Sequence, residues 1–234
     1  MAERIAIMQP YFFPYIGYFQ LISAVDKFII YDNVKYTKKG WINRNRILQN
    51  GIATPLSLPL KSDSDSLDIC QRTLATDFDP DKLLNQICGA YRKAPHFQAA
   101  LPIIERVLHH KSINLFAFLR HSLVQTCNFL NISTPIETSS EIAINHDLRS
   151  KDKVLAICAN QNSKIYINPI GGTELYAKEE FDLHGIKLQF LKSSPLDYQQ
   201  FENSFIPWLS IIDIIMFNSV SSIKSEFISK YELT

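Results

Sequence analysis

The chain has 234 residues, 46% of them hydrophobic and 12% aromatic, which is enough to bury a substantial core. Its 24 Lys and Arg side chains nearly balance 23 Asp and Glu side chains, so the formal net charge is +1. A chain this close to neutral lacks the field that gathers nucleic acid or an anionic membrane surface, and we expect neither partner. The length predicts a single α/β domain over residues 1–234.

The cysteines and the apolar runs bear on the cellular compartment. The longest apolar run, residues 205–217, is interrupted by Pro207, Ser210 and Asp213 and is too short to span a bilayer. No long apolar segment follows the charged residues Glu3 and Arg4, so we expect no signal peptide. The four cysteines are far apart, without a C-x-x-C pair, which is typical of buried thiols in a reducing compartment: Cys70, Cys88, Cys127 and Cys158. A cytoplasmic protein is predicted.

Residues 6–18, AIMQPYFFPYIGY, predict a strand, a tight loop and the start of a helix. An apolar run breaks at Gln9-Pro10, and an amphipathic pattern resumes at residue 19. In parallel α/β sheets, ligands bind beyond the carboxyl ends of the strands. The residues of this loop are therefore candidate ligand contacts, namely Gln9, Pro10, Tyr11, Gly17 and Tyr18. The alternative is that the aromatic residues belong to an ordinary core.

Residues 27–32, KFIIYD, form a second apolar run that ends in an acid. A strand, helix and strand within about thirty residues predict two parallel strands, because a parallel pair needs a crossover connection. Asp32 should then leave the sheet at the same edge as Gln9. We expect both side chains to face one site.

The polar segment that follows, residues 33–47, is rich in hydrogen-bond donors. If residues 41–47 are extended, Arg44 and Arg46 lie side by side on one face, and such a pair suits a phosphate or a carboxylate. The alternative is a solvated edge strand whose charges discourage aggregation. Asn50-Gly51 predicts a β-hairpin turn directly afterwards. Further candidate ligand contacts in this segment are Tyr36, Lys38, Trp41, Asn43 and Asn45.

Three helical patterns fill residues 79–131, which we interpret as a helical insertion or subdomain packed on the sheet. A strand over residues 132–138 should deliver Ser139 and Ser140 to its carboxyl end. A helix is expected over residues 152–160, a strand over 164–168, a helix that begins near Leu175, and a strand over 185–191. The fold class is therefore a mostly parallel, Rossmann-like sheet flanked by helices.

Gly171 and Gly172 lie between a predicted strand and a predicted helix, where unpaired backbone N–H groups resemble an anion cradle. Neither G-x-G-x-x-G nor G-x-x-x-x-G-K-[ST] occurs, so the usual dinucleotide and P-loop interpretations fail. The six histidines and the cysteines show no metal-binding spacing, and we expect no metal. The absence of a G-x-S-x-G elbow leaves acyl-enzyme chemistry unsupported.

Asp213 is a single carboxylate inside the apolar segment WLSIIDIIMF, which is predicted to be a helix. A buried carboxylate is costly unless it is paired, so we expect a partner such as Arg44, Arg46 or a helix N-terminus. The alternative is a structural ion pair or cap. The same segment continues to Asn218.

Four segments together resemble the WbqC-like family of bacterial surface-polysaccharide (O-antigen) gene clusters. They are QPYFFPYIGYFQLI from Gln9, the D-x-V-x-Y-x-K-x-x-W-x-N-R-N run of residues 32–45, INPIGGTELY from Ile167 and FIPWLSIIDIIMFN, which ends at Asn218. Asn218 is included among the candidate ligand contacts. The resemblance runs from end to end of the chain and implies a role in polysaccharide precursor synthesis.

The segment Tyr15-Ile16-Gly17-Tyr18 is similar in layout to the H-x-G-H signature of nucleotidylyltransferases. Both histidines are replaced by tyrosines, which donate hydrogen bonds but supply no imidazolium charge, so adenylyl transfer is not expected. The segment favours a nucleotide-type ligand with altered chemistry.

Together these features predict a transferase that acts on a nucleotide-activated sugar, at an amino group. Its ligand would be a small anionic molecule, a nucleotide or nucleotide-sugar, held by the arginines and the Gly171-Gly172 turn. The candidate acids and bases are Asp32, His146 and Asp213. The alternative is a non-catalytic nucleotide- or sugar-binding protein derived from a nucleotidylyltransferase-like fold. The sequence specifies neither donor, acceptor nor oligomeric state.

Overall fold

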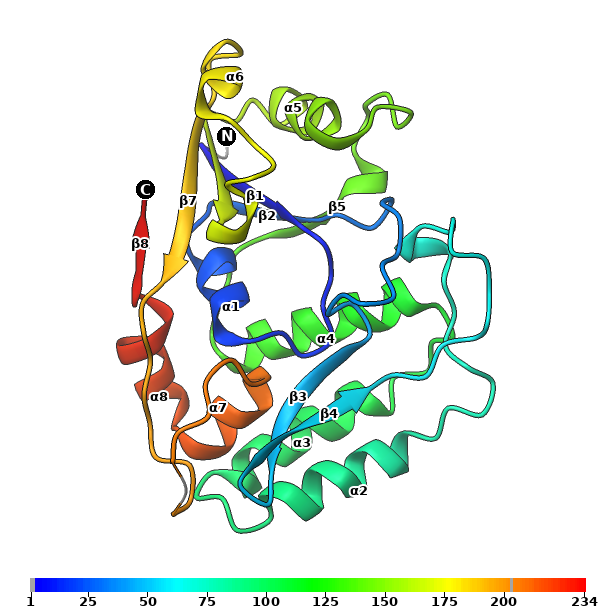
Figure 1. Cartoon of the computed structure of the whole chain (residues 1–234), viewed down its shortest axis with the longest axis vertical. Helices are drawn as coiled ribbons and strands as arrows, with labels where there is room; N and C mark the ends of the chain where they lie inside the picture. The colour runs from blue at the N-terminus through cyan, green and yellow to red at the C-terminus, as the bar shows by residue number, and fades with distance from the viewer. Residues whose placement is uncertain (1–2, 203) are drawn as a thin grey trace.

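The computed structural model describes residues 3–202 and 204–234. Six strands form one sheet in the order β5-β2-β1-β6-β7-β8, and two strands form a separate hairpin (Figure 1). The strands are β1 (Arg4–Met8), β2 (Lys27–Ile30), β3 (Arg44–Gln49), β4 (Ile52–Ser57), β5 (Ile136–Thr138), β6 (Ile165–Pro169), β7 (Lys187–Ser193) and β8 (Tyr231–Leu233).

Five strands of the sheet run parallel, and only β8 at the edge is antiparallel to its neighbour β7. The predicted pairing of the first two strands is confirmed, with Met8 opposite Ile30. Side chains alternate across the sheet, so Ile5 and Ile7 enter one buried cluster while Ala6 enters the other. Burial on both faces is the usual condition of a parallel sheet, and the predicted mostly parallel α/β class is confirmed.

The predicted hairpin of β3 and β4 is also present, with Gln49 paired to Ile52. Asn50 and Gly51 have φ values of 52° and 77°. These positive values suit a two-residue turn whose twist matches that of the strands, and Asn-Gly is the sequence that best accepts them. The turn lies at the end of the molecule remote from the sheet (Figure 1).

The longer helices are α1 (Ile16–Ser23), α2 (Pro80–Tyr91), α3 (Phe97–Leu108), α4 (Leu115–Phe129), α5 (Ser150–Asn160) and α7 (Ile211–Phe217). The shorter ones are η1 (Ile69–Gln71), η2 (Ser139–Glu141), η3 (Ile170–Gly172), α6 (Lys178–Asp182), α8 (Val220–Ser222) and the π-helix η4 (Ile223–Ile228). Helix α2 packs on strand β3 of the hairpin, and α3 packs on α2 and on α7 (Figure 1). Whether residues 79–131 form a separate subdomain remains a prediction.

Two expected helix starts are wrong. No helix opens at Leu175, because the short helix η3 and a turn occupy residues 170–175 and α6 begins only at Lys178. The apolar helix begins at Ile211 instead of Trp208, since Trp208 has a φ of 61° and Ser210 caps the helix by accepting a hydrogen bond from the Ile212 N–H.

The four cysteine thiols are free. Burial raises the pKa of Cys127 and of Cys158 to about 12, so both stay protonated at neutral pH. Within the described residues, no helix combines the length and the apolar character that a bilayer crossing requires.

Candidate functional site

The strand order places a topological switch point at β1. This strand pairs with β2 on one side and with β6 on the other, so the loops that leave β1 and β6 diverge at their carboxyl ends. In open α/β sheets the resulting crevice is where ligands bind. A cleft of about 530 Å³ lies there, which is within the range of small-molecule sites. We call it the switch-point cleft.

Residues from four separate parts of the chain line this cleft. Gln9 and Tyr11 come from the opening loop, Tyr31 and Val34 from the loop after β2, and Ser150 and Lys151 from the start of α5. The remaining polar lining comes from the end of β6 and the residues after it, Asn168, Gly171, Gly172 and Tyr176. Gln9 and the Gly171-Gly172 turn therefore meet at one cleft, whereas Asp32, which was expected to face the same site as Gln9, is not part of its lining.

Gly172 has to be a glycine because of its neighbour Asn168. A Cβ atom added at Gly172 would lie 2.0 Å from Oδ1 of Asn168, which is closer than any real contact. The Asn168 side chain has little room to retreat, because its amide donates a 2.6 Å hydrogen bond to the buried Tyr166 hydroxyl. The backbone of the turn thus approaches Asn168 closely, and this fixes the shape of the cleft floor.

The opening loop is fixed mainly through its own carbonyl oxygens. The side-chain amide of Asn45 donates to the carbonyls of Phe12 and Phe13, at 3.1 and 2.8 Å. The Ser210 hydroxyl donates to the Phe13 carbonyl at 2.7 Å, and the Ile211 N–H donates to the Pro14 carbonyl at 2.9 Å. Residues from the hairpin and from the α7 terminus therefore hold one loop from two sides.

Tyr18 and Gly17 shape this loop from within. Tyr18 is 3% exposed, and its hydroxyl donates to the Gln9 carbonyl at 2.8 Å, so it braces the loop instead of lining the cleft. Gly17 lies against the ring of Tyr15, only 2.4 Å from where a Cβ would stand. Pro10 is buried beside them. The Tyr15-Ile16-Gly17-Tyr18 segment is therefore tightly packed, and the hydroxyl of its second tyrosine is engaged inside the loop.

Asp32 lies where the sequence placed it and meets the predicted serines. Its carboxylate accepts hydrogen bonds from the Ser139 hydroxyl at 2.8 Å, from the Ser140 N–H at 2.9 Å and from the Ser140 hydroxyl at 2.7 Å. The side chain is 1% exposed. Because all three donors come from η2, Asp32 ties the ends of β2 and β5 together.

His146 joins the same cluster through Asn33. The Asn33 amide nitrogen lies 2.9 Å from His146 Nδ1, and its oxygen lies 2.7 Å from the Ser139 hydroxyl. An amide donor at Nδ1 leaves the neutral imidazole with its proton on Nε2. His146 is exposed, whereas the nearby Lys153 is 4% exposed, donates to the Asn33 carbonyl at 3.0 Å and has a pKa lowered by burial.

The run of residues 32–45 serves mainly to hold its own loop. The Tyr36 hydroxyl donates to Asn43 at 2.8 Å, and the Asn43 amide donates to the Leu58 carbonyl at 2.8 Å. Lys38 forms an exposed ion pair with Asp65 at 2.7 Å. Tyr36, Asn43 and Lys38 thus all have structural partners within the protein. The sequence motif alone does not distinguish such structural contacts from ligand contacts.

The two arginines do not form the shared pair that alternation predicts. Arg44 Nε donates to the Gly40 carbonyl at 3.0 Å, which uses this side chain to close a turn. The Arg46 guanidinium instead lies 5.3 Å from the Trp41 ring centre, and its Nη2 is 3.4 Å from the Trp208 carbonyl. Of these two described side chains, Arg46 alone lines a cavity, a small aromatic one beside the opening loop.

Asp213 is fully buried, but its partners are not arginines. Its carboxylate accepts from the Tyr91 hydroxyl at 2.8 Å, the Tyr198 hydroxyl at 2.6 Å and the Gln200 amide at 2.6 Å. It lies in the first turn of α7. Burial raises the pKa of Asp213, and the three hydrogen bonds oppose that rise. The expected arginine partner is thus wrong, whereas the position of Asp213 in the first turn of α7 agrees with the other expectation, a helix N-terminus.

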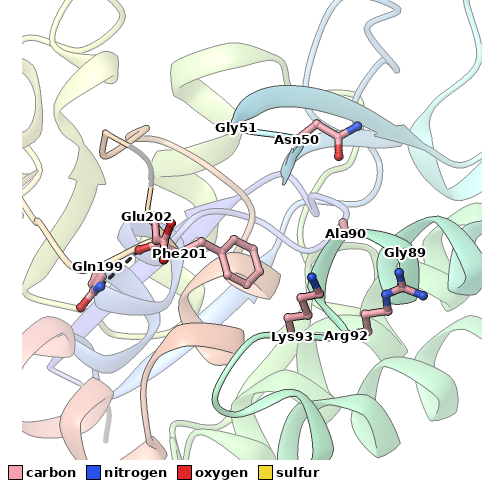
Figure 2. Close-up of a pocket in the computed structure, with 9 residues that line it drawn as sticks. All are labelled: Asn50, Gly51, Gly89, Ala90, Arg92, Lys93, Gln199, Phe201 and Glu202. Atoms are coloured by element: carbon pink, nitrogen blue, oxygen red, sulfur yellow. Dashed lines mark hydrogen bonds between the residues drawn. The ribbon is translucent and has the colours of Figure 1, made fainter.

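Two further regions lie apart from the switch-point cleft. Asn218 follows α7, and its amide donates to the Ile214 carbonyl at 3.1 Å, so it caps that helix. A larger cleft, of about 760 Å³, lies between the hairpin turn, the end of α2 and residues 199–202; Figure 2 shows the basic side chains Arg92 and Lys93 on its α2 side. Its lining contains none of the predicted site residues that the structure describes. Position at the strand ends therefore favours the smaller cleft.

Several cleft residues were not predicted. Asn168 directly follows the apolar run KIYI, which is the position at which parallel strands deliver site residues, so that signal was available. Ser150 and Lys151 begin α5, and Lys151 is paired with Glu180. The described residues contain no group of three His, Cys, Asp or Glu side chains placed to hold a metal ion.

The profile of the WbqC-like protein family matches residues 9–225, which includes the opening loop, most of the lining of the switch-point cleft and α7. The chain belongs to the WbqC-like protein family. It is also 27% identical over 216 residues to Rv1507c, an uncharacterized protein of Mycobacterium tuberculosis strain H37Rv, with 91% of this chain and 93% of that protein aligned. No solved structure matches the chain. These matches establish the family of this WbqC-like chain and specify no reaction.

Proposed function

We propose that this WbqC-like protein is a transferase that acts on a nucleotide-activated sugar, with the nucleotide part bound in the switch-point cleft. The observation that carries the proposal is the position of this cleft at the carboxyl ends of β1, β2 and β6, where open α/β sheets bind nucleotides. Its volume of about 530 Å³ suits a ligand of that size. The role in surface-polysaccharide precursor synthesis rests on the family resemblance.

The phosphates would lie between the Gly171-Gly172 turn and Lys151. The space where a Gly171 side chain would stand is open, so an anion there would approach the backbone N–H groups of the turn. Lys151 forms an ion pair with Glu180 and also lines the cleft, where its ammonium group would supply positive charge to the phosphates. Gln9 and Tyr11 would then contact the sugar. Burial, followed by the charge of Tyr15, raises the pKa of Tyr11 to about 12, so Tyr11 remains a hydrogen-bond donor at neutral pH.

Transfer to an amino group requires a base near the attacking nitrogen. We assign that role to His146, because it is exposed and its Nδ1 is held by Asn33. Asp32 would act through the same cluster by orienting Ser139 and Asn33, since its own oxygens are already engaged by three donors. Asp213 is enclosed in the core and is not assigned a proton transfer.

A thermal-shift series with nucleotides, nucleotide-sugars and acyl-coenzyme A compounds tests the site. We expect a nucleotide-sugar to stabilise the wild-type protein, and Gln9→Ala to weaken its binding about tenfold through one lost hydrogen bond. The matched control is Gln199→Ala in the cleft of about 760 Å³ beside the hairpin turn, and this variant should bind normally. The proposal fails if no nucleotide-sugar stabilises the protein, or if both variants bind alike.

A non-catalytic nucleotide-sugar-binding protein is the second candidate. It is favoured by the segment Tyr15-Ile16-Gly17-Tyr18, in which Tyr18 is buried and engaged with the Gln9 carbonyl, so the chemistry of an H-x-G-H segment is absent from these described residues. Mass spectrometry of the best-binding nucleotide-sugar, incubated with the protein and acyl or aminoacyl donors, separates the two. A new mass that disappears in His146→Ala supports the transferase, and tight binding without any new mass supports the alternative.

A further inference from the structure

The small aromatic cavity beside the opening loop has features of a second binding site. Its volume is about 280 Å³, which is enough for one ring but not for a nucleotide. The side chains that matter are four aromatic rings and one cation, Tyr11, Tyr15, Trp41, Trp208 and Arg46. They come from the opening loop, from the segment before β3, from β3 itself and from the segment before α7. We call this cavity the Arg46 pocket.

The two tryptophans of the Arg46 pocket are exposed in a way that packing does not explain. Trp41 is 43% exposed and Trp208 is 60% exposed, although both are large apolar side chains. Trp208 also adopts a φ of 61°, which a bulky residue rarely does. Backbone strain of this kind gathers at ligand sites, where the surrounding structure holds a side chain in a set orientation. Here it directs the Trp208 ring against Tyr15, at a centroid distance of 5.7 Å and an angle of 62°.

Arg46 supplies an unused donor in the same place. Its Nε atom is buried and has no hydrogen-bond partner among the described residues. Among the described residues, its side chain makes one hydrogen bond, a long one of 3.4 Å from Nη2 to the Trp208 carbonyl. A buried donor without a partner calls for an explanation, and a guanidinium fork is best satisfied by a carboxylate or phosphate that accepts two parallel bonds.

We propose that the Arg46 pocket binds a single sugar ring that carries a carboxylate, that is, a hexuronate unit. The carboxylate would accept from Arg46, and an apolar C–H face of the ring would lie on the tryptophan rings. A flat nucleobase fits less well, because the inclined rings of Tyr15 and Trp208 form no parallel slot. The inference rests on the proposed function in one respect, in that the sugar would be the second substrate.

Tyr11 connects the two sites. It lines both the Arg46 pocket and the switch-point cleft, so ligands in the two cavities would lie on either side of one side chain. That proximity is what a transfer between two bound substrates requires. The loop that carries Tyr11 is held by Asn45, which also lines the Arg46 pocket.

Tryptophan fluorescence tests the Arg46 pocket directly, because both tryptophans of the chain line it. The probe is glucuronate alone, titrated at constant ionic strength, with neutral glucose as the matched compound. We expect a saturable change in emission with a Kd on the order of 1 mM, as befits a ligand of about thirteen heavy atoms. Glucose should bind at least tenfold more weakly.

Substitutions of single arginines distinguish glucuronate binding in the Arg46 pocket from a general attraction of the anion to positive charge. Arg46→Gln should weaken glucuronate binding at least tenfold, and Arg46→Lys should fall in between, since lysine keeps the charge and loses the fork. Arg44→Gln tests the neighbouring arginine that closes the turn at Gly40, and Arg92→Gln serves as a remote control. Both should retain wild-type affinity. Melting temperatures and the emission of each unliganded variant report whether the pocket is intact.

Three results would overturn the inference: no saturable change with glucuronate, equal affinity for glucose, or equal losses in Arg44→Gln and Arg46→Gln. The assay contains no nucleotide, so it is independent of the switch-point cleft. Glucuronate binding without any nucleotide-sugar binding would leave the Arg46 pocket standing and remove the proposed transferase. The reverse outcome would retain the transferase and remove only this pocket.

Discussion

The molecule contains two buried aspartates that are equally well hydrogen-bonded but lie in different surroundings. Asp32 accepts three bonds from Ser139 and Ser140 at the carboxyl edge of the sheet, next to exposed His146. Asp213 accepts three bonds from Tyr91, Tyr198 and Gln200 inside the core. Hydrogen bonds to the Asp32 carboxylate therefore join two strand ends at the edge of the sheet. Hydrogen bonds to the Asp213 carboxylate join three segments of the chain inside the core. Burial alone does not identify a site residue.

The largest expected effect comes from removing the carboxylate of Asp213. In Asp213→Ala three donors, two of them on buried side chains, lose their acceptor, so the free energy of unfolding should fall by about 3 kcal/mol or more. Asp213→Asn keeps one acceptor and should cost about 1–3 kcal/mol. Urea denaturation measures both, and Asp197→Asn, an exposed aspartate in the same segment, is the control. A loss of stability in Asp213→Ala no larger than in the control would contradict a stabilising role for the Asp213 carboxylate.

Replacing Asp32 is expected to have a smaller effect on the free energy of unfolding and, in addition, an effect on His146. Asp32→Asn should lower the free energy of unfolding by about 1–2 kcal/mol, because two of its three donors are serine hydroxyls that can turn to new partners. Since Asn33 links the cluster to His146, the imidazole signals of His146 in an NMR spectrum should shift. Asp213→Asn should leave those signals in place. Equal changes in both variants would show that the two clusters are not independent.

The smallest effect is a pH dependence at Asp213. Burial raises its pKa in the folded state, so the native protein holds a proton at pH values where the unfolded chain has lost it. The stability that this group contributes is then fully present below the unfolded pKa and is lost as the pH rises through the folded pKa.

The stability difference between wild type and Asp213→Asn should therefore be larger near about pH 4 than near about pH 7. Paired urea titrations at the two pH values measure it. A difference that grows toward neutral pH would mean that the three hydrogen bonds outweigh burial and lower the pKa of Asp213.

The sequence predicts the parts of the site that depend on strand order. Apolar runs locate β1, β2 and β6, and parallel strands bring their carboxyl ends together, which is why the meeting of Asp32 with Ser139 and Ser140 was foreseeable. The hairpin turn follows from the local preference of Asn50-Gly51 for positive φ. These features require only local chemistry and one rule of topology.

The remainder depends on long-range packing, which periodicity does not encode. Tyr91 is 122 residues from Asp213 in sequence, so no spacing pattern connects them. Alternation places Arg44 and Arg46 on one face, but the carbonyl of Gly40 captures one of them and the ring of Trp41 the other. Trp208 continues an apolar helical pattern, yet its positive φ keeps it outside α7 and turns it toward Tyr15. In each case a tertiary contact decides between two locally acceptable outcomes.

The way in which the opening loop is held has an evolutionary consequence. Its anchors are the carbonyl oxygens of Phe12, Phe13 and Pro14, and carbonyl oxygens are present whatever the side chains are. Substitutions at the partly buried side chains Tyr11 and Tyr15 therefore leave the loop in place while they alter the cavities that these side chains line, the Arg46 pocket for both and the switch-point cleft for Tyr11. Related proteins can diversify their ligands by changing two residues without rebuilding the scaffold that presents them.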